Sequence, residues 1–265
     1  MLSDNRISTE SSIATPSLPS DDGLEYAGQP LPAPPLSPVA LPEEASPLAP
    51  RPVFAKGWCF AKIFLIFVIG CVIGTYFEQI LTLLETGVWE SRKGVIYGPF
   101  NPIYGLGFAG FVLFLGKNME QRKWYLTWLY ASLLCGVTEY VLNWLGELII
   151  GAKSWDYTGY FLNIDGRTNI PYMLFFGAGG FLFLKFLYPV LSRWIEKIPY
   201  AVGHYGLPVL VVFMCLNILV SYTALIRQAQ RRQGLPPQTI VGQIYDELYT
   251  DEYLKTVFAN MTFGS

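Results

Sequence analysis

The sequence has few charged residues, too few for a soluble globular protein. Charged residues make up 14% of the 265 residues, against roughly 25% in a typical soluble domain, while 52% are hydrophobic. A soluble globular domain is therefore excluded, and the composition predicts an integral membrane protein that has the lipid bilayer as its partner. The formal net charge of −2 gives no sign of a nucleic-acid surface, so no nucleic-acid partner is expected.

Metal-binding and catalytic motifs are also missing. There is one histidine, His204, and the four cysteines lie in apolar runs without C-x-x-C spacing, so neither a metal site nor a disulfide framework is predicted. No Ser-His-Asp set, H-E-x-x-H or Asp-rich motif is present, so no catalytic residue and no cofactor are assigned. Gly116-Lys117-Asn118 lacks the Ser or Thr of a phosphate-binding loop. If ATP is used, a separate ATP-binding subunit must supply it.

The chain divides into three parts. Residues 1–52 are rich in Pro, Ser, Ala and acidic residues, which predicts a disordered tail with local polyproline-II character. Residues 53–228 hold the apolar runs and form the predicted transmembrane domain. Residues 229–265 are predicted to be a polar C-terminal tail.

The apolar runs predict an all-α, polytopic membrane helix bundle with about five transmembrane helices. They cover about residues 57–84, 102–115, 124–150, 170–191 and 206–226. A spanning helix needs roughly 20 apolar residues, so the second run is at the lower limit, and a re-entrant segment is its alternative. The positive-inside rule favours an N-terminus in the cytoplasm, which places Lys117 and Lys197 there as well.

A break rich in glycine and proline, residues 94–105, separates the first two runs. It contains four candidate site residues, namely Gly98, Pro99, Pro102 and Tyr104. Irregular backbone is tolerated at membrane depth only where protein covers it or a water-filled cavity borders it. The break is therefore a candidate for bordering a cavity. The alternative is that its prolines only end one segment and begin the next.

Polar residues inside the apolar runs are the second group of candidates. In the first run, Gly70 and Gly74 form a G-x-x-x-G pair, and Glu78 extends the same packed face. In the third run, polar side chains at i, i+4 and i+8 form one stripe, made of Glu139, Asn143 and Glu147. A charge at the bilayer centre costs on the order of 2.5 to 3.5 kcal/mol, so the stripe should face inward. It could line a path, or it could be a polar clamp between helices.

A polar loop between the third and fourth runs supplies the remaining candidates. These are Trp155, Asp156, Tyr157, Asn163 and Arg167. With five spans, this loop and the Gly-Pro break fall on the same side of the membrane. They are therefore predicted to close over one cavity, with Lys93 and Arg167 as its cations and Glu139 deeper inside.

Together these motifs resemble a bacterial family of ABC-transporter permeases, also called CmpB or type IV. The resemblance covers about Gly57 to Pro199 and rests on the motifs in their order: G-x-x-x-E at 74–78, K-G-V-I-Y-G-P-x-x-P-I-Y-G at 93–105, E-Y at 139–140, W-D-Y at 155–157 and N-x-x-G-R at 163–167. The family favours Arg where this chain has Lys93, and it often doubles the tryptophan where Ser154 precedes Trp155. The resemblance implies a multi-pass protein of the bacterial cytoplasmic membrane.

Three functions remain open on the sequence. The resemblance favours a permease-like subunit of an ABC-type transporter without its own ATPase. A membrane-embedded enzyme acting on a lipid or lipid-linked substrate would use Glu139 or Asp156 as base and Arg167 or Lys93 to hold an anionic head group. A non-catalytic scaffold would use the polar residues only for helix packing. The sequence favours a non-enzyme and gives no substrate, transport direction or oligomeric state.

Overall fold

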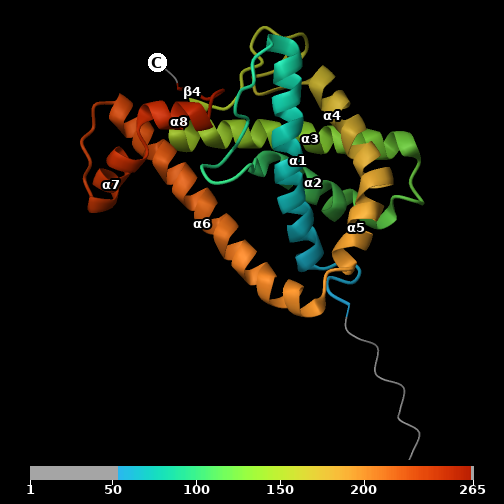
Figure 1. Ribbon diagram of the computed structural model, residues 1–265. Coiled ribbons are helices and arrows are strands. Elements are labelled where there is room, and N and C mark those ends of the chain that lie inside the picture. The colour runs from blue at the N-terminus through green and yellow to red at the C-terminus, as the bar shows by residue number, and fades with distance from the viewer. Residues whose placement is uncertain (1–52, 264–265) are drawn as a thin grey trace, which may run out of the picture. The chain divides into compact units, whose positions relative to one another are not determined.

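The computed structural model describes residues 53–263, so the tail predicted to be disordered, residues 1–52, lies outside the described residues. Nearly all regular structure is helical, which confirms the all-α class (Figure 1). The helices are α1 (Phe60–Thr86), α2 (Pro102–Gly110), a π-helical turn (Phe111–Leu115), a 3-10 turn (Gly116–Asn118), α3 (Trp124–Ile150), α4 (Ile170–Leu182), a second π-helical turn (Phe183–Leu187), α5 (Tyr188–Glu196), α6 (Tyr200–Arg232), α7 (Ile240–Leu248) and α8 (Asp251–Val257).

Four short strands form two antiparallel pairs. In the first pair, β1 (Ala152–Lys153) lies against β4 (Thr262–Phe263), with Ala152 opposite Phe263. In the second pair, β2 (Asn163–Ile164) lies against β3 (Thr168–Asn169). The strands fasten the loop between α3 and α4 and the C-terminal end of the described chain.

Four helical stretches are long and apolar enough to cross a membrane: Phe60–Thr86, Trp124–Ile150, Ile170–Glu196 and Tyr200–Arg232. The predicted second span is helical but shorter. The nine residues of α2 and the five of its π-helical turn reach about 21 Å at 1.5 Å per residue, against roughly 30 Å of hydrocarbon. Between the end of α1 and the start of α2 the chain is irregular over residues 87–101, and its second part is the Gly-Pro loop (residues 94–101).

Close packing of α2 on α1 follows from two glycines on one face of α1. A Cβ on Gly74 would overlap the ring of Tyr104, and a Cβ on Gly70 would overlap Phe108. The G-x-x-x-G pair therefore packs as the sequence predicts. At the start of α2, Pro102 occupies the first turn and the Asn101 side chain accepts a hydrogen bond from the Ile103 N–H at 3.2 Å.

Backbone groups of three residues in the Gly-Pro loop bond α1 and α6. The Asn101 N–H donates to the Cys71 carbonyl at 3.1 Å, near the middle of the 27-residue α1. From α6, the Ser221 hydroxyl accepts from the Ile96 N–H at 2.8 Å, and the Asn217 amide bonds both the N–H and the carbonyl of Tyr97 at 3.1 and 2.7 Å. Protein groups thus satisfy part of this irregular backbone, as burial in an apolar phase requires, while Tyr97 and Gly98 stay exposed.

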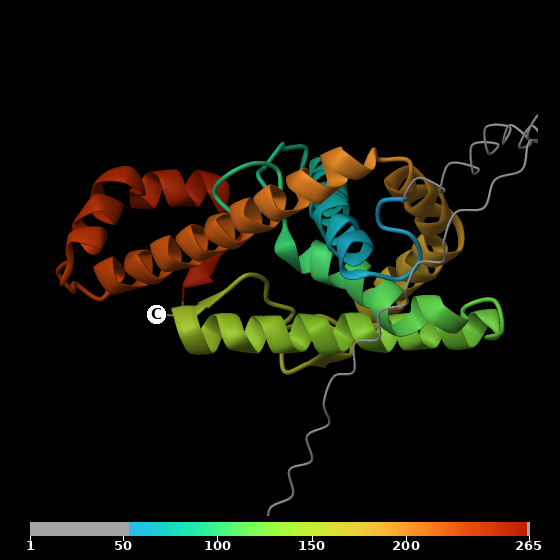
Figure 2. The ribbon, with the colours of Figure 1, turned by 90° about the horizontal axis from the view of Figure 1, so that it is seen from below.

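The third span runs across α1 and packs along α4. Figures 1 and 2 show α3 crossing the direction of α1, with α2 between the two helices. Glycines permit the α3–α4 contact, since a Cβ on Gly136 would overlap Met173 and one on Gly177 would overlap Ser132. The polar stripe of α3 contacts the loop that joins α3 to α4, through Glu139, Asn143 and Glu147.

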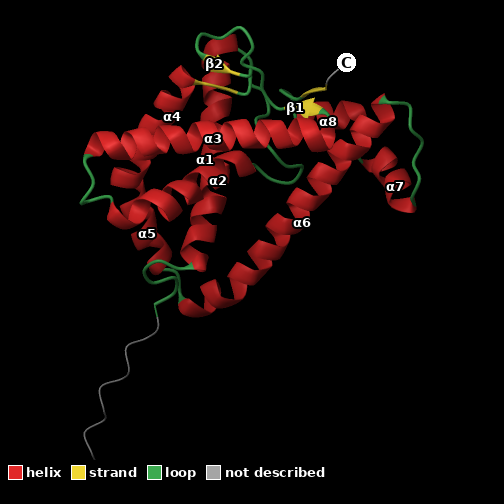
Figure 3. Ribbon diagram, turned by 180° about the vertical axis from the view of Figure 1, so that it is seen from behind, coloured by secondary structure: helices red, strands yellow, loops and turns green. Residues whose placement is uncertain are grey.

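The predicted polar C-terminal tail is largely helical. Helix α6 continues to Arg232, and α7 and α8 fold back beside its end (Figure 3). A buried apolar cluster joins α8 to α6 and to the Gly-Pro loop, and it includes Leu254, Val257, Ala224, Leu225 and Ile96. The C-terminal helices are therefore part of the folded domain.

Candidate functional site

Two carboxylates and two tyrosines meet where α1, α2 and α3 face the loop between α3 and α4. On α1, the Glu78 carboxylate interacts with the hydroxyl of Tyr104 on α2. Tyr104 in turn interacts with Tyr157 and Glu139. Tyr104 can occupy this position because Gly74, one helical turn before Glu78, leaves room for its ring.

Glu139 completes the group from α3. Its Oε2 accepts a hydrogen bond from the Thr168 hydroxyl at 2.7 Å, and its Oε1 accepts a longer one from the Tyr157 hydroxyl at 3.4 Å. We call these five residues, Glu78, Tyr104, Glu139, Tyr157 and Thr168, the carboxylate–tyrosine cluster. The Gly-Pro motif and the Trp155–Arg167 loop both contribute to it.

The hydroxyls in this cluster act as donors. Burial raises the pKa of the Tyr157 phenol, and the neighbouring Glu139 raises it further, so Tyr157 keeps its proton at neutral pH. Glu139 therefore meets neutral hydroxyls, and no lysine or arginine among residues 53–263 forms an ion pair with it. A half-buried carboxylate without a cation can take up a proton or bind a cationic or hydroxylated solute.

Aromatic rings extend from the cluster along α4. The ring centroids of Tyr157 and Tyr172 lie 5.4 Å apart, those of Tyr172 and Phe176 lie 6.2 Å apart, and Phe176 meets Tyr104 edge-on at 6.5 Å. The rings connect the loop tyrosine to the α2 tyrosine on the side of α4. They give the cluster one apolar wall beside its polar groups.

A second group of predicted residues surrounds Arg167, two turns further along α3. Arg167 Nη2 bonds Glu147 Oε2 at 2.7 Å, Nη1 bonds Asn143 Oδ1 at 3.2 Å, and Nε bonds Asp165 Oδ2 at 3.0 Å. The hydrogen bond from Arg167 lowers the pKa of the Asp165 carboxyl, so that carboxyl is ionised at neutral pH. The single guanidinium is therefore occupied by two carboxylates and one amide oxygen.

The same group fastens the loop to α3. Trp155 donates its indole N–H to the Arg167 carbonyl at 2.8 Å, and Asn143 donates to the Trp155 carbonyl at 2.8 Å. We call Asn143, Glu147, Trp155, Asp165 and Arg167 the arginine clamp. Asn163 closes the tip of the loop, where its side chain accepts from the Gly166 N–H at 3.0 Å. In these contacts Asn143 and Glu147 bind a loop to a helix, whereas the clamp considered from the sequence would join two helices.

The cation close to the cluster is Arg92, which the sequence did not single out. Its guanidinium lies near Glu78, donates from Nε to the Thr82 hydroxyl at 2.8 Å and pairs with Glu90 at 3.3 Å. Lys93, the predicted cation, is half-buried, and none of residues 53–263 forms an ion pair with it. The signal that could have identified Arg92 is the basic pair that it forms with Lys93 in the sequence.

Four other predicted residues shape the backbone: Asp156 in the α3–α4 loop, and Gly98, Pro99 and Pro102 in the break at residues 94–105. The Asp156 carboxylate accepts from the Thr158 N–H at 2.8 Å, and hydrogen bonds from Thr158 lower its pKa. It lies in a loop turn, and its carboxylate also pairs with Lys153 at 3.8 Å, so its partners among the described residues are Thr158 and Lys153. Gly98 has a φ of 74°, a conformation that suits glycine, and Pro99 follows it half-buried. Pro102 is buried at the first turn of α2.

Sequence reasoning missed the polar residues that support the site from α6 and from the loop. Asn217 and Ser221, four residues apart in the last apolar run, hold the Gly-Pro loop, and Thr168 donates the shortest hydrogen bond to Glu139. The spacing of Asn217 and Ser221 places both on one helical face and could have predicted an inward polar stripe. Thr168 carried no signal, because its role depends on the β2–β3 turn.

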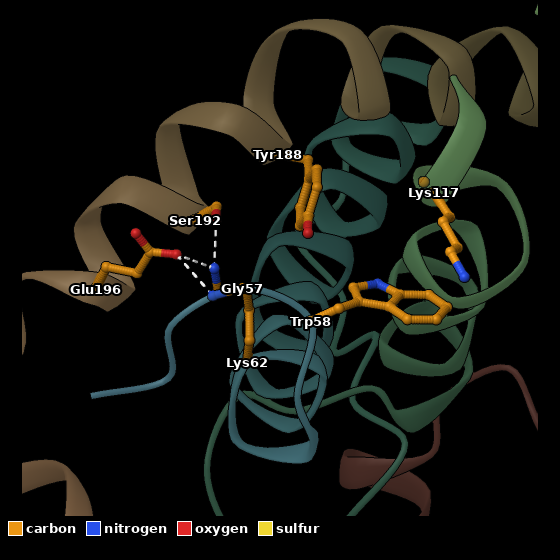
Figure 4. A pocket seen from close by; sticks show the side chains of 8 residues that line it. Gly57, Trp58, Lys62, Lys117, Tyr188, Ser192 and Glu196 are labelled. Atoms are coloured by element: carbon orange, nitrogen blue, oxygen red, sulfur yellow. Dashed lines mark hydrogen bonds and ion pairs between the residues drawn. The ribbon is translucent and has the colours of Figure 1, made fainter. Parts of the chain in front are cut away.

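A cavity of about 320 Å³ lies away from the cluster, at the N-terminal end of α1 (Figure 4). Buried Lys62, on α1, donates to the Ser192 hydroxyl at 2.7 Å and forms an ion pair with Glu196, both on α5. The other side chains shown around the cavity are Trp58, Lys117 and Tyr188. Because Lys62 and Glu196 neutralise each other, we interpret this group as a contact that joins α1 to α5.

The comparisons with known proteins agree with this architecture. A family model described as "Putative ABC-transporter type IV" matches residues 65–222. The match begins within α1, ends within α6 and includes the carboxylate–tyrosine cluster and the arginine clamp. No curated protein and no solved structure matches the chain. The matched segment is more than half of the chain, and the protein belongs to this ABC-transporter type IV family of membrane proteins.

Proposed function

We propose that the protein is the membrane-spanning, permease-like subunit of an ABC-type transporter, a multi-pass protein of the cell membrane that depends on a separate ATP-binding subunit. The family and the four candidate spans support a transporter-related membrane protein. The sequence carries no ATP-binding motif, so the energy source must come from another chain.

The observation that carries the proposal is the environment of Glu139. Holding a carboxylate within an apolar span costs free energy, and the structure does not offset that cost with a cation. Two hydroxyls hold the carboxylate in place, while Glu78 approaches Tyr104 from the opposite helix. We infer that Glu78 and Glu139 contact the transported solute, or its accompanying proton, between α1 and α3.

The partner subunit would bind at the end of the domain that carries Lys56 and Lys117. Gly57, Lys117 and Glu196 line one cavity, so the start of α1, the turn after α2 and the end of α5 meet at this end. Lys197 follows there directly. Under the positive-inside rule a basic end faces the cytoplasm, where an ATP-binding subunit resides.

The enzyme alternative has less support. Arg167, the residue that would hold an anionic head group, has its guanidinium occupied by Glu147, Asn143 and Asp165. The Asp156 carboxylate is bound by Thr158 and Lys153. Of the proposed catalytic groups, Glu139 and Lys93 form no ion pair within residues 53–263, and nothing in the described residues places these two together.

The test combines purification with solute analysis. The full chain, extracted from its native membrane in mild detergent, is expected to bring down an ATP-binding-cassette protein. Lys117→Glu combined with Lys197→Glu should weaken that recovery, and Glu139→Gln should not. Recovery of no ATP-binding protein by the unaltered chain would contradict the subunit proposal.

Untargeted profiling of cell and medium solutes then tests the path. Cells with Glu139→Gln at normal membrane abundance should match cells that lack the protein. Glu120→Gln, a change of the same kind at an exposed residue outside the cluster, should match the unaltered cells. Equal profiles for Glu139→Gln and the unaltered protein would remove Glu139 from the transport path.

A further inference from the structure

Helix α7 (Ile240–Leu248) has an apolar face that no other part of the described chain covers. The side chains of Ile240, Val241, Ile244 and Leu248 are 75%, 57%, 45% and 62% exposed. At roughly 100° per residue these positions fall within about 100° of arc. We propose that α7 is an interfacial helix that lays this apolar face into the surface layer of the lipid bilayer.

The contacts of α7 with α6 place it at the level of the membrane boundary. Arg227 and Asp246 form a two-bond ion pair at 2.8 and 2.8 Å, and the Tyr245 hydroxyl bonds the Thr223 hydroxyl at 3.0 Å. Thr223 and Arg227 flank Ile226, where the last apolar run of the sequence ends. Tyrosine and arginine at the end of a span are typical of the layer between hydrocarbon and water.

The ion pairs also fix which face of α7 turns outward. Arg231 binds Asp246 at 2.7 Å and Asp251, at the start of α8, at 2.6 Å. Behind them, Leu254 and Val257 of α8 are buried in the cluster that includes Ala224. Since Asp246 is held toward α6, α7 cannot roll its apolar face inward without breaking these pairs.

The bilayer is the occupant that fits the size and position of this face. A stable protein interface buries about 800 Å² on each partner, which is more than four side chains of one short helix provide. Exposed apolar side chains continue on the neighbouring α6, including Leu216 and Leu219, where lipid must cover them. The apolar face of α7 therefore lies next to surface that the membrane already occupies.

The helix is linked to the Gly-Pro loop. Tyr249, which directly follows α7, bonds its hydroxyl to that of Tyr97 at 2.8 Å. Tyr97 is held in turn by Asn217 of α6. An interfacial α7 would therefore anchor the loop that leads into α2 to the membrane surface.

Spin labels on adjacent residues of α7 provide the test. In a full chain whose native cysteines are replaced, Ile244→Cys and Gln243→Cys are labelled and reconstituted in vesicles of phosphatidylcholine and phosphatidylglycerol. Ile244 should collide several-fold more often with oxygen than with a water-soluble nickel chelate. Gln243, exposed on the polar face, should show the reverse.

The outcomes distinguish whether lipid, water or protein covers the apolar face of α7. Equal nickel accessibility at the two positions would mean that the face lies in water and would overturn the proposal. Protection of Ile244 from both reagents would mean that a protein surface or a second copy covers it, which also overturns it. If cysteine replacement prevents folding, Ile244→Trp and Gln243→Trp in the native chain serve instead. Brominated phosphatidylcholine should then quench the added fluorescence at 244 only, and equal quenching would contradict the proposal.

Discussion

Glu139 and Glu147 lie two turns apart on the same face of α3, and the structure treats them differently. Glu147 forms a 2.7 Å ion pair with Arg167, within a clamp that also includes Asn143 and Asp165. Glu139 receives hydrogen bonds from the hydroxyls of Thr168 and Tyr157. One carboxylate is neutralised by a cation, and the other is only held in position.

The difference separates structural polar residues from functional candidates. A carboxylate whose charge is compensated stabilises a contact, and its removal leaves the partner cation uncompensated. A carboxylate that lacks a cation adds a cost to folding, so its presence in a membrane span needs another explanation. The periodicity of α3 groups the two glutamates, and only their partners distinguish them.

The largest expected effect on stability comes from removing the cation of the clamp. Arg167→Met leaves Glu147, Asp165 and Asn143 without their shared donor. The free energy of unfolding should fall by about 2 kcal/mol, because three hydrogen bonds from the guanidinium are lost while solvent screens the Glu147 and Asp165 carboxylates, which are 43% and 62% exposed. Thermal unfolding in detergent measures the loss, and Arg193→Met, at an exposed arginine of α5, is the matched control with little expected change. Equal stabilities would show that the clamp does not hold the loop.

A second effect tests the packing that brings Tyr104 to Glu78. In Gly74→Ala the added methyl group overlaps the ring of Tyr104, so overpacking should cost about 1 to 3 kcal/mol. Gly107→Ala is the control, since nothing lies within 4 Å of the Cβ position at this helical glycine. It should retain or raise the unfolding temperature. If the two variants unfold alike, close contact between α1 and α2 does not position Tyr104.

A pH effect is expected at the ion pairs of Asp246 on α7 with Arg227 and Arg231 on α6, which we call the C-terminal clasp. Hydrogen bonds from Arg227 lower the pKa of Asp246 from 3.8 to about 2. A carboxyl whose pKa is depressed in the folded state contributes stability above its unfolded pKa and loses it as the pH falls through the folded value. The clasp should therefore hold at pH 5 and release between pH 4 and 2.

A spin label at Gln243→Cys reports this release as increased mobility on acidification. The added change Asp246→Asn is the control, because it removes the charge at every pH and should give a mobile label already at pH 6. A label whose mobility at pH 2 equals that at pH 6 would contradict the role of the ion pair.

The smallest effect on stability is expected from the long hydrogen bond to Glu139. Tyr157→Phe removes a hydroxyl 3.4 Å from Glu139 and should cost less than about 1 kcal/mol. Thr168→Val removes the 2.7 Å bond of a buried hydroxyl and should cost more. Thermal unfolding of the two variants gives the comparison, and a larger loss for Tyr157→Phe would reverse the roles that we assign to these donors.

Much of the fold could be predicted from the sequence because apolar length is a strong signal. Trp124–Ile150 agrees with the third predicted run, and the packed face of Gly70 and Gly74 follows from spacing alone. The second run was predicted to be at the lower limit of spanning length, and α2 with its π-helical turn begins and ends with it. The helices α7 and α8 were not predicted, because α7 contacts α6 through ion pairs and α8 buries only a few apolar side chains, so their sequence looks like a polar tail.

The sequence identified most residues of the site, but it did not identify which of them contact each other. Periodicity identified the α3 stripe, and motifs identified Tyr104 and Tyr157. Nothing in the sequence says that Arg167 turns to Glu147 rather than Glu139, because the β2–β3 turn sets that direction. The proximity of Arg92, rather than Lys93, to Glu78 likewise depends on how the chain leaves α1.

The most direct test compares Glu139→Gln with Glu147→Gln in one experiment that measures unfolding temperature, membrane abundance and solute profile. Glu139→Gln is expected to keep its stability within about 1 kcal/mol and to lose the solute phenotype. The amide carbonyl can still accept the 2.7 Å bond from Thr168, the 3.4 Å bond from Tyr157 is the one lost, and a charge is removed from the apolar span. Glu147→Gln should lower the unfolding temperature. The fraction of this variant that folds should still give the solute profile of unaltered cells. The opposite pattern, or a normal solute profile with Glu139→Gln, would contradict the assignment of Glu139 to function and Glu147 to structure.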